Sequence, residues 1–482
     1  MKSGMLIAVL LYELIVIGGI GLWLAKQRAG RKREEGDFAL GGRDLPVSVT
    51  AITLALTVLG TAHILGVFEM SWFLGAAAVW FSIAHVILLV VVCLSTGIWF
   101  RKMKLTTVPQ VLRDFFGVGT ELAVSAVMAG VLFGILTLEA QGLGIIMASM
   151  TGWTIREGAF VGGTMGVLYV VLAGMKEVGW INLVNAVVLY VGLILSVIFL
   201  ALRLPGGNFE TVATFYEAEP HLLSIYGNAD IMINFAIATT VAVVFSQGIN
   251  QMLLQPAMSA KDEKTVRKAL WIAAPVNGLF GVFAVVIGLT AKSVPEFNAM
   301  GPKVAATAML VEYLPTWLAT LLLASFLAAI LSTFAMVALA PATIFSVNIY
   351  KNLYNPGANE DQVTRVTRGA IVFLALIAMG IAAYLPPILA AINWLFAWLV
   401  PVFWVVIFGF VWKRSANAAM VTLVTAWVVN SAWSFTSLPT ALGLAPDFPN
   451  AYVTLIVTLV VGILCNATMS GRVGYFEEQR SA

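Results

Sequence analysis

Charged residues are scarce in this chain. Only 11% of its 482 residues are Asp, Glu, Lys or Arg, whereas 60% are hydrophobic. A soluble globular domain carries about twice that share of charge. Together with a mean hydropathy of +0.95, this composition excludes a water-soluble protein and predicts an all-α polytopic membrane protein, because helices satisfy their own backbone groups in lipid.

Cysteine and histidine are also rare. Both cysteines, Cys93 and Cys465, lie in apolar segments, which excludes a disulfide framework and indicates small buried side chains. The three histidines, His63, His85 and His221, lie in separate segments without metal-ligand spacing, and neither HExxH nor GxSxG occurs. We therefore expect no enzyme activity and no nucleic-acid partner.

Apolar stretches of membrane-spanning length alternate with short polar connections. About twenty apolar residues cross the hydrocarbon core as a helix. By this measure we predict thirteen transmembrane helices, at residues 5–25, 46–72, 77–100, 119–150, 158–175, 179–202, 230–257, 268–291, 316–349, 366–384, 388–412, 416–436 and 449–469. The first lacks a small-residue cleavage site, so we expect a retained helix rather than a signal peptide.

Lys and Arg are unevenly distributed between the connections. With thirteen spans, most of the 27 fall on one side of the membrane, including clusters at 26–33, 101–104, 261–268, 365–368 and 413–414. Cytoplasmic loops are enriched in these residues. We therefore predict an external N-terminus, a cytoplasmic C-terminal tail and a multi-pass location in the lipid bilayer of a bacterial inner membrane.

Three connections are expected to hold short helices. Residues 208–227 and 294–312, on the predicted outer side, are long and contain charged residues or prolines. Residues 107–116 have helical spacing and predict an interfacial helix on the cytoplasmic side. No connection is long enough for a soluble domain.

The segment 321–351 has no charge before Lys351 and predicts a central transmembrane helix. Its Ala329, Ser332 and Thr333 follow i, i+3, i+4 spacing, which places a carbonyl and two hydroxyls on one face. Hard cations prefer clustered oxygen ligands, so this face is a candidate cation site. Membrane Ser and Thr also bond to their own helix or to a neighbouring one, and the residues alone leave both interpretations open.

The order of spans indicates a repeat of five helices. The spans 46–72 and 230–257 each open a block of five, and the second block enters the membrane from the opposite side, as in inverted-repeat transporters. The predicted parts are an N-terminal helix and basic loop (1–45), a first repeat (46–203), an outer loop (204–229), a second repeat (230–412), and two further helices with a short tail (413–482).

Both opening helices contain a glycine among polar residues at membrane depth. The polar neighbours are Thr57, Thr61 and His63 around Gly60, and Ser246, Gln247, Asn250 and Gln251 around Gly248. Such groups are costly in lipid unless the backbone lines a cavity. Packing through small residues would explain the glycines but not the polar side chains. We therefore expect both helices to be broken.

Four stretches carry a family resemblance. DFALGGRDLP (37–46) looks like an entry to the first repeat helix, and GMKEVGWINLVNA (174–186) resembles the turn that opens the fifth. NQMLLQPAMSAKDEKTVRKA (250–269) is similar to the stretch leaving the sixth, and LAAILSTFAMVALAPATIFSVNIYK (327–351) resembles the eighth. Their order and spacing resemble the sodium/solute symporter family, which includes sodium-coupled proline, sugar, monocarboxylate and pantothenate carriers.

The resemblance implies a LeuT-type fold, with ten core helices, one helix before them and two after. It also implies a sodium ion between the first and eighth core helices. Its ligands would be the hydroxyls of Ser332 and Thr333 and the carbonyl oxygens of Ala329, Leu56 and Leu59. Backbone carbonyls are available to an ion in the first helix only where that helix unwinds.

Three positions depart from the family's patterns. Some members have an acid near a second sodium where this chain has Asn182, proline carriers have an aspartate where it has Val58, and sugar carriers have an aromatic gate where it has Met252. A neutral amide does not supply a carboxylate's charge, so we predict one sodium per solute. Neither proline nor galactose follows as the substrate.

The predicted solute-binding residues are the polar groups at cavity depth: Thr61, His63, Glu139, Gln141, Gln247, Asn250 and Gln251. An acid in a long apolar helix needs a partner, so Glu139 could carry a proton, contact a solute amine or hydroxyl, or bond to His63. Glu69 and His85 lie nearer helix ends and are expected at the interface. Lys and Arg are absent from mid-span positions, which argues against a fixed cation clamping an anionic solute.

We therefore expect a sodium-coupled symporter that imports a small organic solute by alternating access, as a monomer. Proton coupling through Glu139 or His63 is the near alternative. A membrane sensor is a different-class alternative, because symporter-like membrane halves also occur fused to signalling kinases. The short tail after the last predicted span is expected to leave no room for such a domain.

Overall fold

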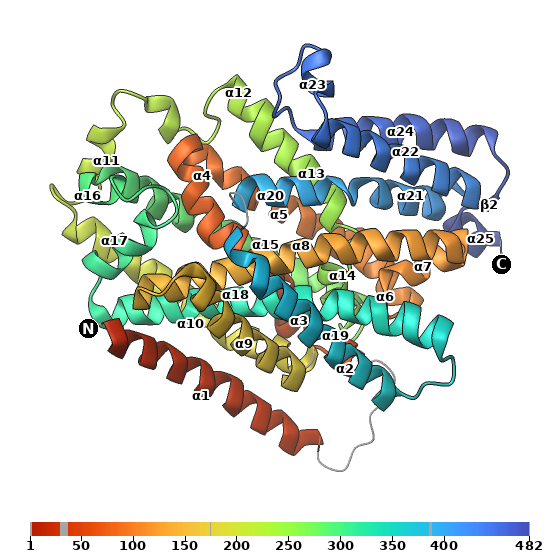
Figure 1. Cartoon of the computed structure of the whole chain (residues 1–482), viewed down its shortest axis with the longest axis horizontal. Helices are drawn as coiled ribbons and strands as arrows, with labels where there is room; N and C mark the ends of the chain where they lie inside the picture. The colour runs from red at the N-terminus through yellow and green to blue at the C-terminus, as the bar shows by residue number, and fades with distance from the viewer. Residues whose placement is uncertain (1, 29–36, 174, 385–387, 482) are drawn as a thin grey trace.

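The computed structural model describes residues 2–28, 37–173, 175–384 and 388–481, and most of them are helical (Figure 1). Two short strands, β1 (Lys413–Arg414) and β2 (Arg472–Val473), pair antiparallel. A helix satisfies its backbone N–H and C=O groups within its own segment, which suits so apolar a chain. The predicted all-helical class is confirmed.

The helices coincide with the predicted spans. The first part of the chain contains α1 (Lys2–Arg28), α2 (Asp37–Leu40), η1 (Gly41–Arg43), α3 (Val47–Thr57), η2 (Ala62–Gly66), α4 (Val67–Leu74), η3 (Gly75–Val79), α5 (Trp80–Val91), η4 (Val92–Thr96), α6 (Gly97–Met103), α7 (Val108–Phe116), α8 (Val118–Thr151), α9 (Ile155–Ala173) and α10 (Met175–Arg203). Within the predicted basic cluster, residues 29–33 lie outside the described residues.

The second part begins with short helices and ends with the strand pair. It contains α11 (Glu210–Phe215), η5 (Pro220–Leu223), α12 (Ala229–Ile231), η6 (Met232–Ile237), α13 (Ala238–Gln247), α14 (Gln251–Met258), α15 (Glu263–Ser293), α16 (Pro295–Asn298), α17 (Ala305–Tyr313), α18 (Thr316–Ile344), η7 (Phe345–Tyr354), α19 (Glu360–Ile381), η8 (Ala382–Tyr384), α20 (Ile388–Ala397), α21 (Val400–Val411), α22 (Ala416–Phe435), α23 (Leu438–Ala441), α24 (Asn450–Thr468) and α25 (Tyr475–Ser481).

Eleven helical runs within the described residues are long and apolar enough to cross a bilayer, which is fewer than the number predicted. The run Ala62–Met103 counts once, although its 42 residues are about twice the length that one crossing needs. Gly75 interrupts this run with a φ of +62°. The count also omits α9, whose 19 residues coincide with a predicted span. The thirteen crossings therefore stay a prediction.

The helix α18 forms the centre of the molecule, as the uncharged segment 321–351 predicts. Every residue from 322 to 344 is buried. The helices α8, α9, α10 and α19 pack against it, and α1 contacts it from outside the predicted repeats. The polar side chains of α18 therefore face neighbouring helices rather than lipid.

Both predicted helix breaks are confirmed. The helix α3 ends at Thr57 and helical structure resumes at Thr61, so residues 58–60 are not helical. The second break separates α13 from α14 at residues 248–250. Each break is buried, and Gly60 and Gly248 each lie within one, as expected where backbone leaves the helix inside a membrane protein.

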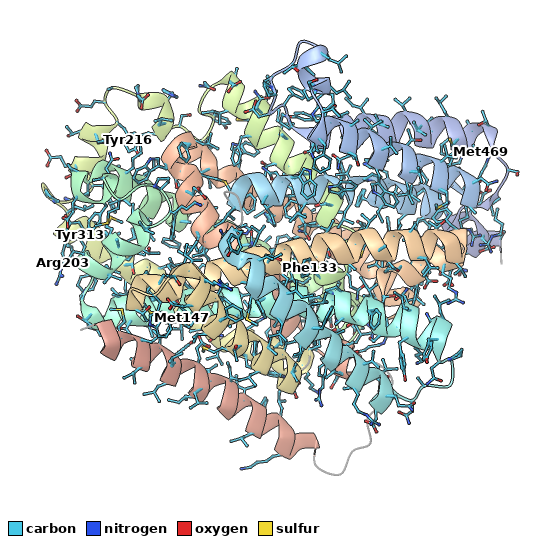
Figure 2. The ribbon with its side chains drawn as sticks, viewed as in Figure 1. Phe133, Met147, Arg203, Tyr216, Tyr313 and Met469 are labelled. Carbon is cyan, nitrogen blue, oxygen red and sulfur yellow. The ribbon has the colours of Figure 1, made fainter. Side chains whose placement is uncertain are left out.

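The two termini lie at opposite ends of the long axis in Figure 1. The short helices α11, α16 and α17 gather at the end with the N-terminus and confirm the helices expected at 208–227 and 294–312. At this end, the Arg203 guanidinium donates to the carbonyl of Tyr313 at 3.1 Å (Figure 2). An odd number of crossings would place the termini on opposite membrane faces.

The helix α7 confirms the short helix expected at 107–116. Thr107 caps its first turn, and the Gln110 side chain accepts a hydrogen bond from the Thr107 backbone N–H at 3.0 Å. Such a reciprocal capping box fixes where a helix begins. The apolar face of α7 is buried against α8, so the polar face remains for other contacts.

Candidate functional site

The first helix break lies against the middle of α18. The Thr333 hydroxyl is 3.1 Å from the carbonyl oxygen of Leu56 and 3.3 Å from that of Ala329. Leu56 lies in the last turn of α3, just before the break, and Leu59 lies within the break. The structure thus brings Leu56, Ala329 and Thr333 together from two helices that are distant in sequence.

Ser332 differs from the other hydroxyls of the same helix. Its Oγ is fully buried and has no hydrogen-bond partner among the described residues. In contrast, Ser325 and Thr343 donate to carbonyls of their own helix, each at 2.8 Å. Leaving a buried hydroxyl unpaired costs about 1–3 kcal/mol. The unpaired Ser332 hydroxyl beside Thr333 is therefore better explained as a cation ligand than as a hydroxyl bonded to its own helix.

The Glu139 carboxylate occupies the first break. One of its oxygens, Oε2, accepts hydrogen bonds from both the backbone N–H and the hydroxyl of Thr61, each at 2.9 Å. A Cβ at Gly60 would lie 2.5 and 2.7 Å from the two carboxylate oxygens, and one at Gly142 would lie 1.9 Å from Thr61 Oγ1. Only glycine at these two positions leaves room for the contact. The partner of Glu139 is therefore Thr61 and not His63.

His63 instead belongs to a buried aromatic group. Its Nδ1 lies 2.6 Å from the Val58 carbonyl oxygen, and its ring is 4.4 Å from that of His85 and 4.7 Å from that of Phe81. His85 is only 2% exposed, and Glu69 only 7%. Because His85 packs against His63 beside the first break, the prediction that His85 lies at the interface is wrong. The interfacial position of Glu69 stays a prediction, although α15 covers α4.

The second break orders a different set of amides. The Asn250 side-chain oxygen accepts a hydrogen bond from the Met252 N–H at 3.0 Å and so caps α14. Gln251 points away from the first break: its amide bonds to the Val108 N–H at 2.7 Å and the Thr106 carbonyl at 3.1 Å. The structure therefore does not group Gln251 with the other predicted solute-binding residues.

Four of the predicted solute-binding residues keep a buried atom without a partner among the described residues. These atoms are His63 Nε2, Gln141 Oε1, Gln247 Oε1 and Asn250 Nδ2. Asn182, where some family members have an acid, is also fully buried, and both of its side-chain polar atoms are unpaired within the described chain. Buried polar groups are normally paired, so these atoms mark places where a bound molecule or water could bond.

The charged pairs lie away from the breaks. In the described parts of the chain, Arg113 pairs with Glu121 at 3.7 Å, Lys176 with Asp44 at 3.6 Å, and Arg414 with Glu478 at 2.7 Å. None of these cations belongs to the surroundings of Glu139. A candidate solute near the first break would therefore meet one carboxylate and neutral groups.

A polar cavity of about 80 Å³ lies at the end of α18 that is predicted to face the cytoplasm. Thr343, Ser346 and Lys351 line it together with residues of α2, α7 and α19. Ten residues separate Thr343 from Thr333, which is about 15 Å along a helix. The cavity therefore does not contain the predicted solute-binding residues.

Sequence reasoning missed Gly142 and His85 as parts of the site. Gly142 follows Glu139 by three residues and so lies on the same face of α8, a spacing that could have indicated a close approach. His85 follows His63 by more than twenty residues, and no local pattern connects them. The two rings meet only in the folded protein, where α15 packs against both α4 and α5.

Comparison with known proteins gives a family match. The model of the sodium:solute symporter family matches residues 38–425. A sodium/glucose cotransporter of Vibrio parahaemolyticus is 23% identical, with 94% of this chain and 88% of that protein covered. A sodium/pantothenate symporter of Escherichia coli is 24% identical, with 93% and 94% covered.

A solved structure has the same fold. It is a Na⁺-coupled sialic acid symporter in a substrate-bound outward-open state, with a TM-score of 0.82 and 17% sequence identity. The match covers 97% of this chain and 98% of that one. At this identity the similarity establishes the helix arrangement and not the solute.

Proposed function

This chain belongs to the sodium:solute symporter family, and on that premise we propose that it imports one small organic solute with one sodium ion across a bacterial inner membrane. The proposal includes thirteen crossings, an external N-terminus, a cytoplasmic tail, and inverted repeats at 46–203 and 230–412. The functional unit is a monomer.

The observation that carries the proposal is the contact between Thr333 and Leu56 beside the unpaired Ser332 hydroxyl. The proposed sodium ligands are Ser332 Oγ, Thr333 Oγ1 and the carbonyl oxygens of Ala329, Leu56 and Leu59. These five oxygens carry no formal charge, which suits a monovalent ion that must leave again. Asn182 supplies no carboxylate for a second ion, which supports a single sodium.

Sodium couples to the solute through the broken helix. An ion bound between α3 and α18 holds these two helices together. This favours the outward-open state and completes the solute site. The membrane potential drives the ion inward with about 2.3 kcal/mol per charge per 100 mV. Release inside then reopens the two helices, as alternating access requires.

The proposed solute site uses Thr61, His63, Glu139, Gln141, Gln247 and Asn250. Of these, Thr61 and Glu139 bond directly to each other, and the other four keep an unpaired buried atom. Gln251 is proposed instead to hold α14 against the connection between α6 and α7.

Transport measurements test this proposal. Purified protein is screened by thermal shift against small solutes in sodium, since a ligand of the native state raises its stability. A compound that binds is then offered to proteoliposomes with sodium or potassium outside. The proposal expects uptake only with sodium; uptake that persists in potassium and follows a proton gradient would favour coupling through Glu139 or His63.

A further inference from the structure

We propose that Glu139 sets the chemical class of the solute. The solute offers amine or hydroxyl donors and carries no free carboxylate. This inference rests on the proposed transport function and concerns the same site. It comes from the position of the Glu139 carboxylate in the first helix break.

The first helix break offers a site for an anion, and the Glu139 carboxylate of the same chain occupies it. The segments η2 and α4 form one continuous helix over residues 62–74. At its N-terminal end, the N–H groups of His63 and Ile64 donate to the Gly60 carbonyl at 3.1 and 3.0 Å. Helix N-termini attract anions through backbone N–H groups and the helix dipole. Here the Thr61 N–H already donates to Glu139 at 2.9 Å. A solute carboxylate would have to displace Glu139 or lie beside it.

The fit around Glu139 is close enough to hold the carboxylate in place. Glu139 is 3% exposed, and a Cβ at Gly60 would clash with its carboxylate, as one at Gly142 would with Thr61. The Thr61 hydroxyl adds a second hydrogen bond to the same oxygen. This arrangement keeps the Glu139 carboxyl group at a fixed position beside the candidate solute site.

Most of the buried unpaired atoms of the predicted solute-binding residues are acceptors. The Thr57 hydroxyl, just before the break, is also unpaired in the described part of the chain and can donate or accept. No donor among the described residues reaches Glu139 Oε1, and the unpaired atoms of His63, Gln141 and Gln247 are a ring nitrogen and two carbonyl oxygens. With Nδ1 donating to the Val58 carbonyl, His63 Nε2 is an acceptor. Asn250 Nδ2 is the one unpaired donor in this set within the described chain.

A ligand must complement this inventory. Acceptors are satisfied by N–H and O–H groups, and a fixed carboxylate favours a protonated amine over a neutral hydroxyl. A solute carboxylate would place like charges together in a site where no Lys or Arg of the described residues pairs with Glu139. Amines and polyols therefore fit, and carboxylates do not.

A matched thermal-shift panel tests this inference. Wild type in saturating sodium is screened against amines, polyols and carboxylates of the same carbon skeletons. We expect amines and polyols, but not carboxylates, to raise the melting temperature. Glu139→Gln should weaken binding of an amine at least tenfold, whereas Glu121→Gln, which alters another buried acid on α8, should leave it unchanged.

Each outcome decides the matter. A carboxylate that stabilises the wild type, an amine whose affinity survives Glu139→Gln, or a panel in which neither amines nor polyols bind would overturn the inference. The melting temperature in sodium without any solute distinguishes this failure from failure of the proposed function. If sodium raises the melting temperature but the solute classes behave otherwise, only the inference about Glu139 is wrong.

Discussion

The Thr61–Glu139 pair is the residue-scale feature that shapes the first break. Two hydrogen bonds of 2.9 Å connect the carboxylate to Thr61, and glycine at two neighbouring positions allows the contact. The sequence predicts that an acid at this depth needs a partner. It could not identify Thr61, because a backbone N–H becomes available only after the helix has broken.

Gly142 provides a residue-scale prediction. In Gly142→Ala the added Cβ would lie 1.9 Å from Thr61 Oγ1, so Thr61 must move away from Glu139. Overpacking of this kind costs about 1–3 kcal/mol. We expect a lower melting temperature and weaker solute binding, measured by thermal shift. Gly130→Ala on the same helix is the control, because nothing lies within 4 Å of its Cβ; equal behaviour of the two variants would contradict the packing argument.

At the scale of elements, hydropathy and glycine placement predict where helices begin, break and end. The breaks at 58–60 and 248–250 follow from polar residues that lipid would not tolerate. Hydropathy and glycine placement do not predict which helices pack against each other. The burial of His85 depends on α15 covering α5, and the bonds of Gln251 depend on α14 meeting the residues before α7.

The contact between α25 and β1 gives an element-scale prediction. Arg414 donates to Glu478, and this hydrogen bond holds the pKa of Glu478 below its ordinary value. Because the folded state lowers this pKa, the contact stabilises docking of α25 at neutral pH and is lost as pH falls through the lowered pKa. The protection factors of residues 475–481, which are corrected for the intrinsic pH dependence of amide exchange, should therefore fall in acid.

A variant separates this contact from general acid unfolding. Glu478→Gln should show fast exchange of α25 already at neutral pH, with the remaining helices unchanged. Glu477→Gln is the matched control, because Glu477 is exposed and forms no ion pair within the described chain. Similar exchange in both variants would mean that the bond to Arg414 does not hold α25.

Gln251 gives a second element-scale prediction. Gln251→Leu removes the bonds to Thr106 and Val108 and leaves a buried N–H unpaired, which costs about 1–3 kcal/mol. We expect a lower melting temperature but unchanged sodium concentration for half-maximal stabilisation. Gln247→Leu, at the break, should instead weaken solute binding. A weaker solute affinity in Gln251→Leu would place Gln251 in the solute site after all.

At the scale of the whole molecule, composition predicts a polytopic helical protein, and four motifs predict its family. Helix length and composition do not give the number of crossings, because the run Ala62–Met103 is helical almost throughout and is interrupted by a single glycine with positive φ. The distribution of Lys and Arg supplies the predicted sidedness, which helix positions alone do not contain.

Accessibility labelling tests the predicted sidedness. The native cysteines, Cys93 and Cys465, are both buried and are first replaced by alanine. A membrane-impermeant maleimide should then label Glu217→Cys on intact cells, whereas Glu477→Cys should react only after permeabilisation. Both positions are exposed. The opposite pattern would reverse the orientation, and labelling of both on intact cells would require an even number of crossings between the two positions.

The sodium dependence of the melting temperature tests the ion site most directly. We predict that replacing potassium with sodium stabilises the wild type, and that Ser332→Ala and Thr333→Ala each raise the half-maximal sodium concentration about tenfold, equivalent to about 1.4 kcal/mol of lost binding energy. Ser325→Ala, two turns away and bonded only to its own helix, should match the wild type. Wild-type sodium dependence in both site variants would contradict the proposed site.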